Sequence, residues 1–521
     1  MTQRADKLPP NTYDIAVIGA GIHGLSMACE SASRGLKTVL VHSGKLGEGA
    51  SAEPTIIAGA DIVKLESLNV SDVATNFEEL ALLRSKAPHL VRPIPTYFTH
   101  NPTARSERRA NFGLALYRRL QGREVFPFST KFPAAPLTVI KAQHLLKRSA
   151  WEHTINPLRV SIALVQQAQE LGVFLLTNQK VSGATRLADS WSLSLESDFA
   201  ASKSEITAKA LITCTGPVAS DTLASILGVK TRCKATANHL GYIYFKRSTV
   251  ETLDSSEEQH PRDKDRDNSG ARFFDNGAVA IQQDDKSLVY VHTFDEQHLC
   301  AGPIIAQDKS AESKAKAIAT FLQHWNRYSQ EALVSNDITH SRWSALAMVE
   351  DSVQKSSERT HESWLDLNNP GHAAPLLTLF GSNLIQFRLI AERGLDILEP
   401  FTGTKKSKDF AHLPLPGGDL HERSIEQVFA QLEERFSFIS RSILQRLFAT
   451  YGTAINVILA SVQTLEDIGE HFGHGLYQRE VDYLVSCEWA KTADDVLWKR
   501  TRLGLIFNER EVQQLENYLK S

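Results

Sequence analysis

Cysteine is scarce in this sequence, and its arrangement argues against two kinds of site. The 521 residues include five cysteines, namely Cys29, Cys214, Cys233, Cys300 and Cys487. No two of them form a C-x-x-C pair, and their scatter gives no disulfide framework, so neither a structural zinc site nor a secreted disulfide scaffold is expected. Isolated thiols are typical of the reducing cytosol, and we expect a cytoplasmic protein without a bound metal.

Two further absences narrow the functional class. The net charge is only −3, which offers no general attraction for nucleic acid. No apolar run is long enough to cross a bilayer, and the polar residues 1–11 lack the apolar segment of a secretory signal. Contact with a membrane surface through a patch of side chains stays open.

The most informative feature that is present is a glycine motif near the N-terminus. A short apolar run at residues 14–18 leads into G-A-G-I-H-G, which supplies Gly19, Gly21 and Gly24 in the pattern G-x-G-x-x-G. The first glycine permits a tight turn, the second lets the backbone approach a pyrophosphate, and the third lets a helix pack close to the strand. Because the N–H groups of a helix N-terminus favour negative charge, we predict a dinucleotide site here.

The position expected to bind the ribose of such a cofactor is occupied by His42. An acidic residue at the end of the second strand normally accepts hydrogen bonds from the ribose. An imidazole can bond one hydroxyl but lacks the bidentate acceptor of a carboxylate. Two interpretations of His42 follow, a ribose ligand or a polar residue at a strand end.

Hydrophobic patterning predicts strands that alternate with helices, which is typical of an α/β fold. Buried strands are predicted at residues 14–18, 38–41, 173–176, 210–213, 288–291 and 376–380. Helices are predicted at residues 22–34, 158–170 and 388–398, with amphipathic helical blocks at 442–449, 478–489 and 494–503. Residues 249–270 are dense in charged residues, serine and proline, so we expect a polar, exposed insertion there.

Several sequence blocks, in a fixed order along the chain, point to one family. They are the glycine motif and residues 83–91, 215–217, 375–381, 389–392, 415–418, 465–469, 472–474, 483–485 and 488–501. The last block, E-W-A-K-T-A-D-D-V-L-W-K-R-T, is long and specific. Together the blocks resemble the FAD-dependent (aerobic) glycerol-3-phosphate dehydrogenases.

The resemblance implies an α/β fold in three parts. It implies a glutathione-reductase-like, Rossmann-type FAD-binding domain, a substrate domain built on a mixed sheet, and a helical C-terminal domain. We therefore expect a flexible tail at residues 1–12 and an FAD-dependent oxidoreductase region at 13–413, interrupted by the insertion at 249–270. A helical domain at 419–521 follows the P-L-P-G-G segment at 414–418.

The resemblance also implies an activity and partners. In the family, noncovalent FAD accepts a hydride at N5 from the secondary alcohol of glycerol 3-phosphate, and the electrons pass to membrane quinone. The implied substrate is a small molecule, glycerol 3-phosphate or a related polyol, and no nucleic-acid partner is expected. The implied location is cytoplasmic, with a peripheral position on the inner face of the cytoplasmic membrane as an option, and a homodimer stays open.

The residues that the resemblance assigns to the site are spread along the chain. The cofactor-binding residues would be Gly19, Ala20, Gly21, Ile22, His23, Gly24, His42, Ser51, Val181, Thr215, Gly216, Gly381, Asn383 and Leu384. The candidates for catalysis are His239, as a proton acceptor, and Lys64, as a cation for an anionic substrate. Each also has a structural interpretation, a core histidine and a solvated surface lysine respectively. Arg159 is expected to form a structural salt bridge.

Five positions depart from the family pattern. Gly59 stands in place of the family's active-site histidine, Val63 in place of an arginine and Lys64 in place of a tyrosine. Ala347 replaces a second arginine, and Asn383 replaces a lysine. Because arginine is well suited to hold a phosphate, these changes remove much of the expected phosphate site.

Three functions therefore stay open at the level of sequence. The first is a flavin enzyme of the glycerol-3-phosphate dehydrogenase type. The second keeps the flavin but takes a less anionic substrate. The third is a non-catalytic paralogue that acts as a binding or scaffold protein.

Overall fold

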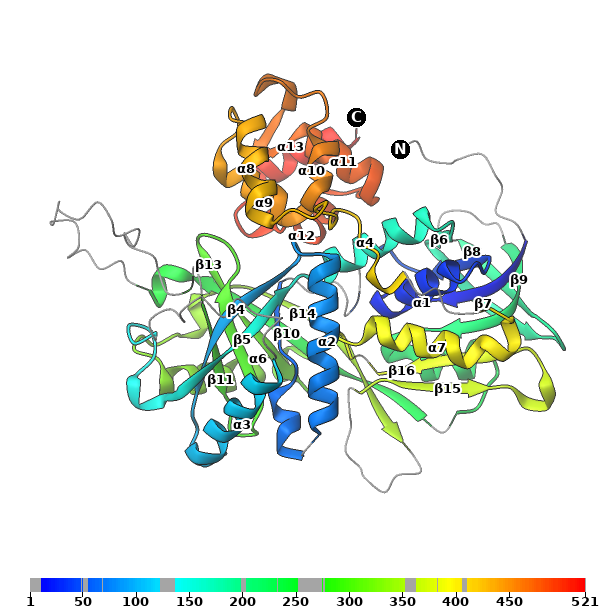
Figure 1. The fold of residues 1–521 in the computed structure, drawn as a ribbon, viewed down its shortest axis with the longest axis horizontal. Helices are drawn as coiled ribbons and strands as arrows, with labels where there is room; N and C mark the ends of the chain where they lie inside the picture. The colour runs from blue at the N-terminus through cyan, green and yellow to red at the C-terminus, as the bar shows by residue number, and fades with distance from the viewer. Residues whose placement is uncertain are drawn as a thin grey trace.

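The computed structural model describes residues 11–47, 49, 55–67, 69–121, 136–197, 203–231, 233–251, 274, 277–351, 362–381, 383–404 and 410–520. Figure 1 shows two sheets next to each other, with a helical unit at the top of the view. Residues 1–10 of the expected tail and 252–270 of the expected insertion lie outside the described residues.

The first sheet is mostly parallel, with strand order β15–β16–β9–β1–β2–β6 and an antiparallel β7–β8 pair attached through β9. Its strands are β1 (Thr12–Ile18), β2 (Thr38–His42), β6 (Phe174–Thr177), β7 (Gln179–Arg186), β8 (Trp191–Ser197), β9 (Lys203–Thr213), β15 (Trp364–Asn368) and β16 (Leu376–Phe380). The strands β1, β2, β9 and β16 pair in parallel and are largely buried, which explains their continuous apolar runs. The predicted strands in this sheet are confirmed.

Three helices, α1 (Ile22–Ser33), α4 (Pro157–Glu170) and α7 (Phe387–Thr402), share a hydrophobic core with this sheet. Gly394 allows α7 to approach α1 closely, because a Cβ atom there would lie 2.7 Å from Cε of Met27. All three predicted helices are confirmed. The third continues past its predicted end at residue 398, and it ends before Gly403, whose φ of 69° is left-handed.

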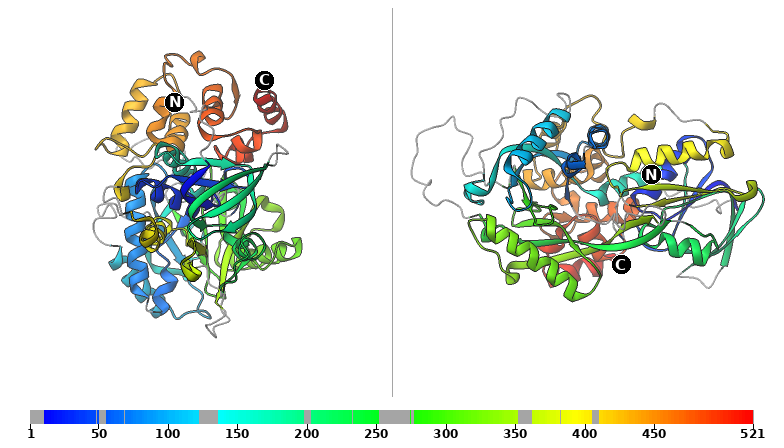
Figure 2. Two further views of the ribbon diagram at one scale, coloured as in Figure 1. Left: turned by 90° about the vertical axis from the view of Figure 1, so that its right-hand side faces the viewer. Right: turned by 90° about the horizontal axis from the view of Figure 1, so that it is seen from below.

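The second sheet is mixed, with strand order β14–β10–β13–β12–β11–β4–β5–β3. Its strands are β3 (Ile56–Ala58), β4 (Val91–Thr99), β5 (Leu145–Ile155), β10 (Cys233–Lys246), β11 (Ala278–Gln282), β12 (Leu288–Thr293), β13 (His298–Ala306) and β14 (Ile338–Asp351). Its β4–β11 pair is parallel and the other neighbours are antiparallel. The helices α2 (Val70–Lys86), α3 (Glu107–Leu120) and α6 (Ala311–Tyr328) lie beside it, and Figure 2 shows them from two further directions. Only the strand at 288–291 was among the predicted elements.

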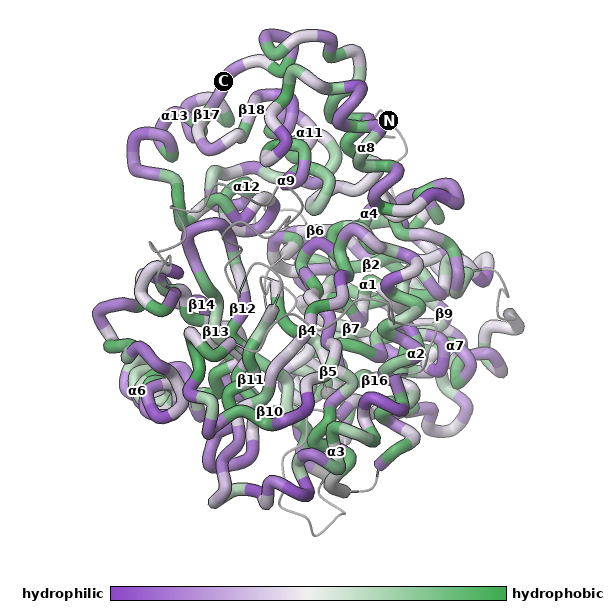
Figure 3. Tube along the Cα trace, turned by 60° about the vertical axis from the view of Figure 1, so that its left-hand side comes forward, coloured by the Kyte–Doolittle hydropathy of each residue, from purple (hydrophilic) through white to green (hydrophobic). Residues whose placement is uncertain are grey.

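Hydropathy follows this layering. In Figure 3, β10, β11 and β13 of the second sheet are largely green, whereas α6 carries both purple and green residues. The apolar side of α6 places Phe321 and Trp325 in the core formed with β11, β12 and β13. Within the described residues, no helix combines the length and the apolar character that crossing a bilayer requires.

The C-terminal unit is helical and has a hydrophobic core of its own. Its elements are α8 (Ile425–Arg435), α9 (Arg441–Tyr451), α10 (Ile455–Ile458), β17 (His471–Gly473), β18 (Leu476–Tyr477), α11 (Gln478–Glu488), α12 (Ala493–Lys499) and α13 (Glu509–Lys520). The first two predicted amphipathic blocks correspond to α9 and α11. The third ends early, because α12 stops at Lys499 and a separate turn of helix, η13 (Leu503–Leu505), follows.

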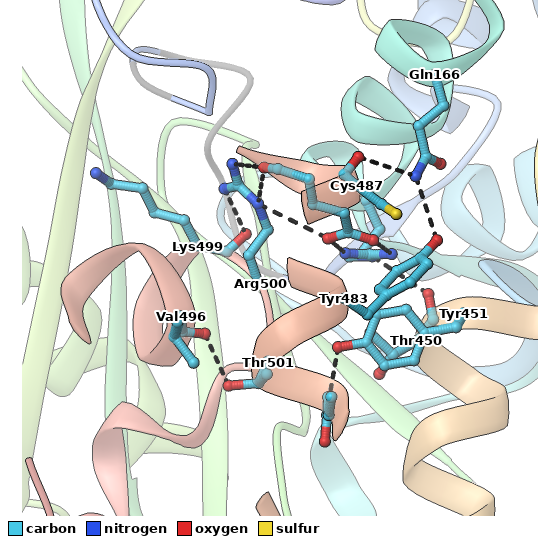
Figure 4. Close-up of polar contacts among 12 residues, drawn as sticks. Gln166, Thr450, Tyr451, Tyr483, Cys487, Val496, Lys499, Arg500 and Thr501 are labelled. Atoms are coloured by element: carbon cyan, nitrogen blue, oxygen red, sulfur yellow. Dashed lines mark hydrogen bonds and ion pairs between the residues drawn. The ribbon is translucent and has the colours of Figure 1, made fainter. Parts of the chain in front are cut away.

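The C-terminal unit docks on α4 through a buried ion pair. Nη2 of Arg159 lies 2.8 Å from Oε1 of Glu488 in α11, and Nε of Arg159 donates to the Thr450 carbonyl oxygen at 3.2 Å. Arg500 donates to the Glu488 backbone carbonyl from its Nε and Nη2. Figure 4 shows Arg500 and Thr450 at this contact, while the Tyr451 hydroxyl donates to the separate carboxylate of Glu480. The salt bridge predicted for Arg159 is confirmed.

Candidate functional site

A cavity of ≈ 670 Å³ lies between the two sheets. The carboxyl ends of β1, β2, β9 and β16 bound one side of it, through Ile18, Val41, Cys214 and Leu379. In open α/β sheets, ligands bind outside the carboxyl ends of parallel strands. The volume is in the range of cavities that enclose a small molecule or part of a cofactor.

Most of the residues predicted to contact the cofactor line this cavity. They are Gly19, Ala20, Gly21, Ile22, His23, His42, Val181, Thr215, Gly216, Gly381 and Leu384. Gly24 and Asn383 are not among the lining residues, and Ser51 lies outside the described residues. The fold therefore brings residues from both ends of the oxidoreductase region to one place, while their individual roles stay predictions.

The glycines of the motif are required by close backbone approaches. Gly19 has a φ of 106°, and a Cβ atom there would overlap the carbonyl oxygen of Cys214. A Cβ atom on Gly24 would overlap the carbonyl oxygen of Gly19. Both obstacles are backbone atoms, which cannot rotate away as a side chain can. The turn between β1 and α1 thus admits no side chain at either position.

The N-terminus of α1 fits a phosphate group. Its N-cap residue, Gly21, supplies no capping side chain, and the first turn contains no acidic residue. The first N–H groups of a helix have no partner within the helix, and the helix dipole adds partial positive charge. Since Gly21, Ile22 and His23 line the cavity, this end of the helix can bind a pyrophosphate there.

A second polar group in the cavity wall also suits a ligand. The hydroxyl oxygen of Thr215 is buried and has no hydrogen-bond partner among the described residues. A buried hydroxyl without a partner is costly, so such a group usually meets a ligand or a water. The Thr215 hydroxyl and the N-terminus of α1, which no side chain caps, together show that the residues of this cavity fit a dinucleotide.

His42 lies at the end of β2, where the ribose partner was expected. Its Nδ1 accepts the N–H of Ala20 at 3.4 Å, and its Nε2 lies 3.3 Å from the Lys45 carbonyl oxygen. With Nδ1 accepting, Nε2 carries the proton and donates to Lys45. Both ring nitrogens therefore contact the backbone, which favours the interpretation of His42 as a polar residue that organises the strand end.

His23 and Asn383 connect the glycine turn to the loop after β16. Burial lowers the pKa of His23 to about 4, so its imidazole is neutral at pH 7, and its Nε2 lies 3.0 Å from the Asn383 carbonyl oxygen. The Asn383 side chain accepts the N–H of Ile385 at 3.2 Å. At the position of the family's lysine, Asn383 thus orders a loop and carries no charge for a substrate.

The opposite wall of the cavity is apolar and comes from the second sheet. Its residues are Leu240 and Tyr242 of β10, Pro303 and Ile305 of β13, and Leu346 and Ala347 of β14. This surface suits a flat aromatic group and excludes water from it. Sequence reasoning missed all of these except Ala347, because the three strands are far apart in the chain. The continuous apolar and aromatic run L-G-Y-I-Y-F at 240–245, which is typical of a buried strand, was the available signal.

The two catalytic candidates are not among the described residues that line the cavity. Lys64 forms ion pairs with Glu362 and, at 3.3 Å, with Asp72, and these carboxylates offset burial to raise its pKa. His239 lies in β10 next to Leu240, and neighbouring residues of a strand point to opposite faces. Leu240 lines the cavity, whereas His239 is not among its lining residues. Catalytic roles for both residues stay predictions that this geometry does not support.

Gly59, which the resemblance places at the position of the family's histidine, has no room for a side chain. A Cβ atom there would lie 2.5 Å from Oε2 of Glu152. Glu152 is 1% exposed, and the Tyr117 hydroxyl donates to its Oε2 at 2.9 Å while accepting the N–H of Ala60 at 2.7 Å. A buried carboxyl group therefore lies against Gly59, and burial raises the pKa of Glu152 to about 8.

The Glu152→Gln variant is expected to lose a pH dependence of stability. The carboxyl pKa is 4.5 in the unfolded chain and about 8 in the folded one, so the folded state binds the proton more tightly. The contribution of protonated Glu152 to the free energy of unfolding is fully present below about pH 4.5. As the pH rises from there to about 8, about 4 kcal/mol of this contribution is lost. Chemical denaturation at pH 5 and pH 9 measures this, and parallel pH profiles for the two proteins would contradict it.

Comparison with known families gives two matches. The model described as "FAD dependent oxidoreductase" matches residues 14–370. The model described as "C-terminal domain of alpha-glycerophosphate oxidase" matches residues 410–520. The two matches correspond to the two-sheet region and to the helical unit.

Individual relatives are similar over nearly the whole chain. A glycerol-3-phosphate dehydrogenase of Pseudomonas aeruginosa is 29% identical over 516 residues, covering 98% of this chain and 95% of the relative. A D-erythritol 1-phosphate dehydrogenase of Brucella abortus is 28% identical over 513 residues, covering 96% of each. The crystal structure of a glycerol-3-phosphate dehydrogenase from Bacillus halodurans complexed with FAD has a TM-score of 0.69 and 15% identity, and covers 98% of this chain and 94% of that chain. This likeness shows a shared fold, with an FAD-binding α/β region, a mixed sheet and a helical C-terminal region.

Proposed function

Because the chain belongs to the family of FAD-dependent oxidoreductases, we propose that it is a flavin dehydrogenase of the glycerol-3-phosphate type. Its substrate would be a short polyol that carries a phosphate group, oxidised at a secondary alcohol. The observation that carries this proposal is the cavity between the two sheets, with the glycine turn on one side and an apolar wall on the other.

The residues of the cavity suit the parts of FAD. The N-terminus of α1 would hold the pyrophosphate, and Leu240, Tyr242 and Ile305 would pack beside the ring system and keep water away from it. When bound, FAD supplies a hydride acceptor at its N5 atom. The protein's own contribution is to orient the substrate over this wall and to remove the hydroxyl proton, for which His239 stays the candidate from the sequence.

Support for the substrate class comes from the relatives. A glycerol-3-phosphate dehydrogenase and a D-erythritol 1-phosphate dehydrogenase are similar to nearly the whole chain, and the substrates in their names are both polyols with one phosphate. Passage of the electrons to membrane quinone, at a peripheral site on the inner face of the cytoplasmic membrane, completes the proposal. A homodimer is compatible with it and is not required.

Anaerobic addition of glycerol 3-phosphate to the purified protein is expected to bleach its flavin absorbance. Oxidation of the substrate reduces the flavin, and without oxygen the reduced form persists. Stopped-flow absorbance measures the rate, and glycerol serves as the control without a phosphate. A colourless protein that cannot be reconstituted with FAD would overturn the proposal, as would a flavin reduced by neutral polyols alone.

A further inference from the structure

One end of the cavity lies where the start of β7 meets the end of β2. His42, the last residue of β2, pairs in parallel register with Thr177 of β6. The N–H of Asn178 then donates to the carbonyl oxygen of Gly44 at 3.4 Å, which places the first residues of β7 beside the turn that follows β2. In dinucleotide sites the end of the second strand faces the ribose. The adenosine half of a bound cofactor would therefore lie at this end of the cavity.

Gln179, the first residue of β7, lines the cavity at this end. Val181 is two residues further along the same strand, is 4% exposed and belongs to a buried apolar cluster of the first sheet. Side chains two residues apart on a strand point to the same face, so Gln179 points to the side on which Val181 is buried. Ile226, in the short helical turn η5 (Thr222–Ile226), packs against the same cluster and also lines the cavity. The Gln179 side chain therefore points toward the part of the cavity that η5 bounds.

The amide of Gln179 is available to a ligand. It is the one primary amide among the described residues that line the cavity. Gln179 is half-buried, and its side-chain oxygen and nitrogen have no hydrogen-bond partner in the part of the chain that the structure describes. The Thr222 hydroxyl, in contrast, donates to the Val218 carbonyl oxygen at 2.9 Å. Gln179 thus offers a hydrogen-bond acceptor and a donor side by side at the cavity wall.

The other side chains near Gln179 suit a flat ring with apolar faces. Val181, Val218 and Ile226 all line the cavity. Val218 is 53% exposed although it is apolar, and a ring that lies against it would remove this surface from water. Adenine has such faces, and its edge presents the N6 amino group as a donor next to a ring nitrogen that accepts. A glutamine amide pairs with this edge through two hydrogen bonds.

We propose that Gln179 recognises the adenine of the cofactor, with its amide oxygen accepting from N6 and its amide N–H donating to the neighbouring ring nitrogen. This inference rests on the proposed function for the presence of FAD. It supplies a contact for the adenosine half that the end of β2 does not, because both ring nitrogens of His42 contact the backbone. Gln179 is then a residue that determines specificity for an adenine nucleotide and takes no part in the oxidation itself.

Displacement of FAD from the wild-type holoenzyme by two nucleotides tests this inference without any variant. The nucleotides are ADP and purine riboside 5′-diphosphate, which lacks the N6 amino group, and flavin fluorescence measures the FAD released. We expect ADP to displace FAD at about 3- to 10-fold lower concentration, which is the effect of one hydrogen bond between neutral groups. Equal potency of the two nucleotides would overturn the inference.

The Gln179→Leu variant assigns this preference to the residue, with Gln169→Leu as the matched control. Gln169 belongs to α4, is exposed, and is not among the described residues that line the cavity. We expect the preference for ADP over the purine analogue to disappear in Gln179→Leu and to persist in Gln169→Leu. A preference that persists in Gln179→Leu would show that other groups recognise the adenine.

Isothermal titration of the purified full-length chain with ADP separates this inference from the proposed function. If glycerol 3-phosphate does not reduce the flavin, but Gln179→Leu weakens ADP binding and Gln169→Leu does not, the proposed function fails and the adenine site stands. If glycerol 3-phosphate reduces the flavin while ADP binds equally to both variants and to the wild type, the proposed function stands and the role of Gln179 is wrong.

Discussion

The Gly24→Ala variant is expected to be purified without its flavin. The added methyl group would overlap the carbonyl oxygen of Gly19, so α1 must move away from the turn that follows β1. Overpacking costs about 1–3 kcal/mol of stability, and the part of this cost that applies only to the FAD-binding geometry lowers the affinity by about 10- to 100-fold. The helix N-terminus would also be displaced from the pyrophosphate, which weakens the same contact.

Visible absorbance of the purified protein measures the flavin content of this variant. Gly113→Ala is the matched control, because Gly113 also lies inside a helix, α3, and an added Cβ atom there would contact nothing within 4 Å. The control is expected to keep its flavin and its stability, since alanine favours a helix over glycine. A yellow Gly24→Ala protein with wild-type affinity for FAD would contradict the assignment of this turn to the pyrophosphate.

The Glu488→Gln variant is expected to unfold at a much lower denaturant concentration than the wild type. Glu488 is fully buried between Arg159 and Arg500, and Oε2 lies 3.7 Å from Nε of Arg500. Burial by itself lowers the pKa of Arg159, yet the Glu488 carboxylate raises it above its usual range, so Arg159 keeps its charge in the buried pair. Removing one charge of a buried pair leaves the other uncompensated, at a cost of about 3–5 kcal/mol.

Chemical denaturation followed by tryptophan fluorescence measures this loss. Glu196→Gln removes the same charge from an exposed pair, in which Glu196 lies 3.0 Å from Lys203, and it is expected to leave the midpoint unchanged. An unchanged midpoint in Glu488→Gln would show that the C-terminal unit is held by its apolar contacts alone. Separate transitions for the two regions would show that this pair couples them.

Much of the fold could be predicted because its signals are local. The strands of the first sheet are continuous apolar runs, since both faces of a parallel sheet are covered. The dinucleotide turn could be predicted from Gly19 and Gly24, because the backbone approaches that require glycine are made within a few residues or to the adjacent strand. The start of α4 also has a local signal, because Asn156 is its N-cap residue. The Asn156 side chain accepts the N–H of Arg159 at 3.1 Å.

The substrate side of the cavity could not be predicted in the same way. Leu240, Ile305 and Leu346 meet only because β10 pairs with β13 and β14 in a specific register, and a shift of one residue would turn each side chain to the other face. Side-chain direction in an antiparallel sheet depends on distant partner strands, which local patterns do not record.

The sequence by itself therefore determined the glycine turn, the order of the elements and the presence of a helical C-terminal unit, because each depends on residues close together in the chain. Only the tertiary structure decided that Glu152 lies against Gly59, that Lys64 is paired with carboxylates, and that Arg159 meets Glu488 of the C-terminal unit. The physical reason is that the charge and space around a buried group are set by its neighbours in three dimensions, and these come from segments far apart in the chain.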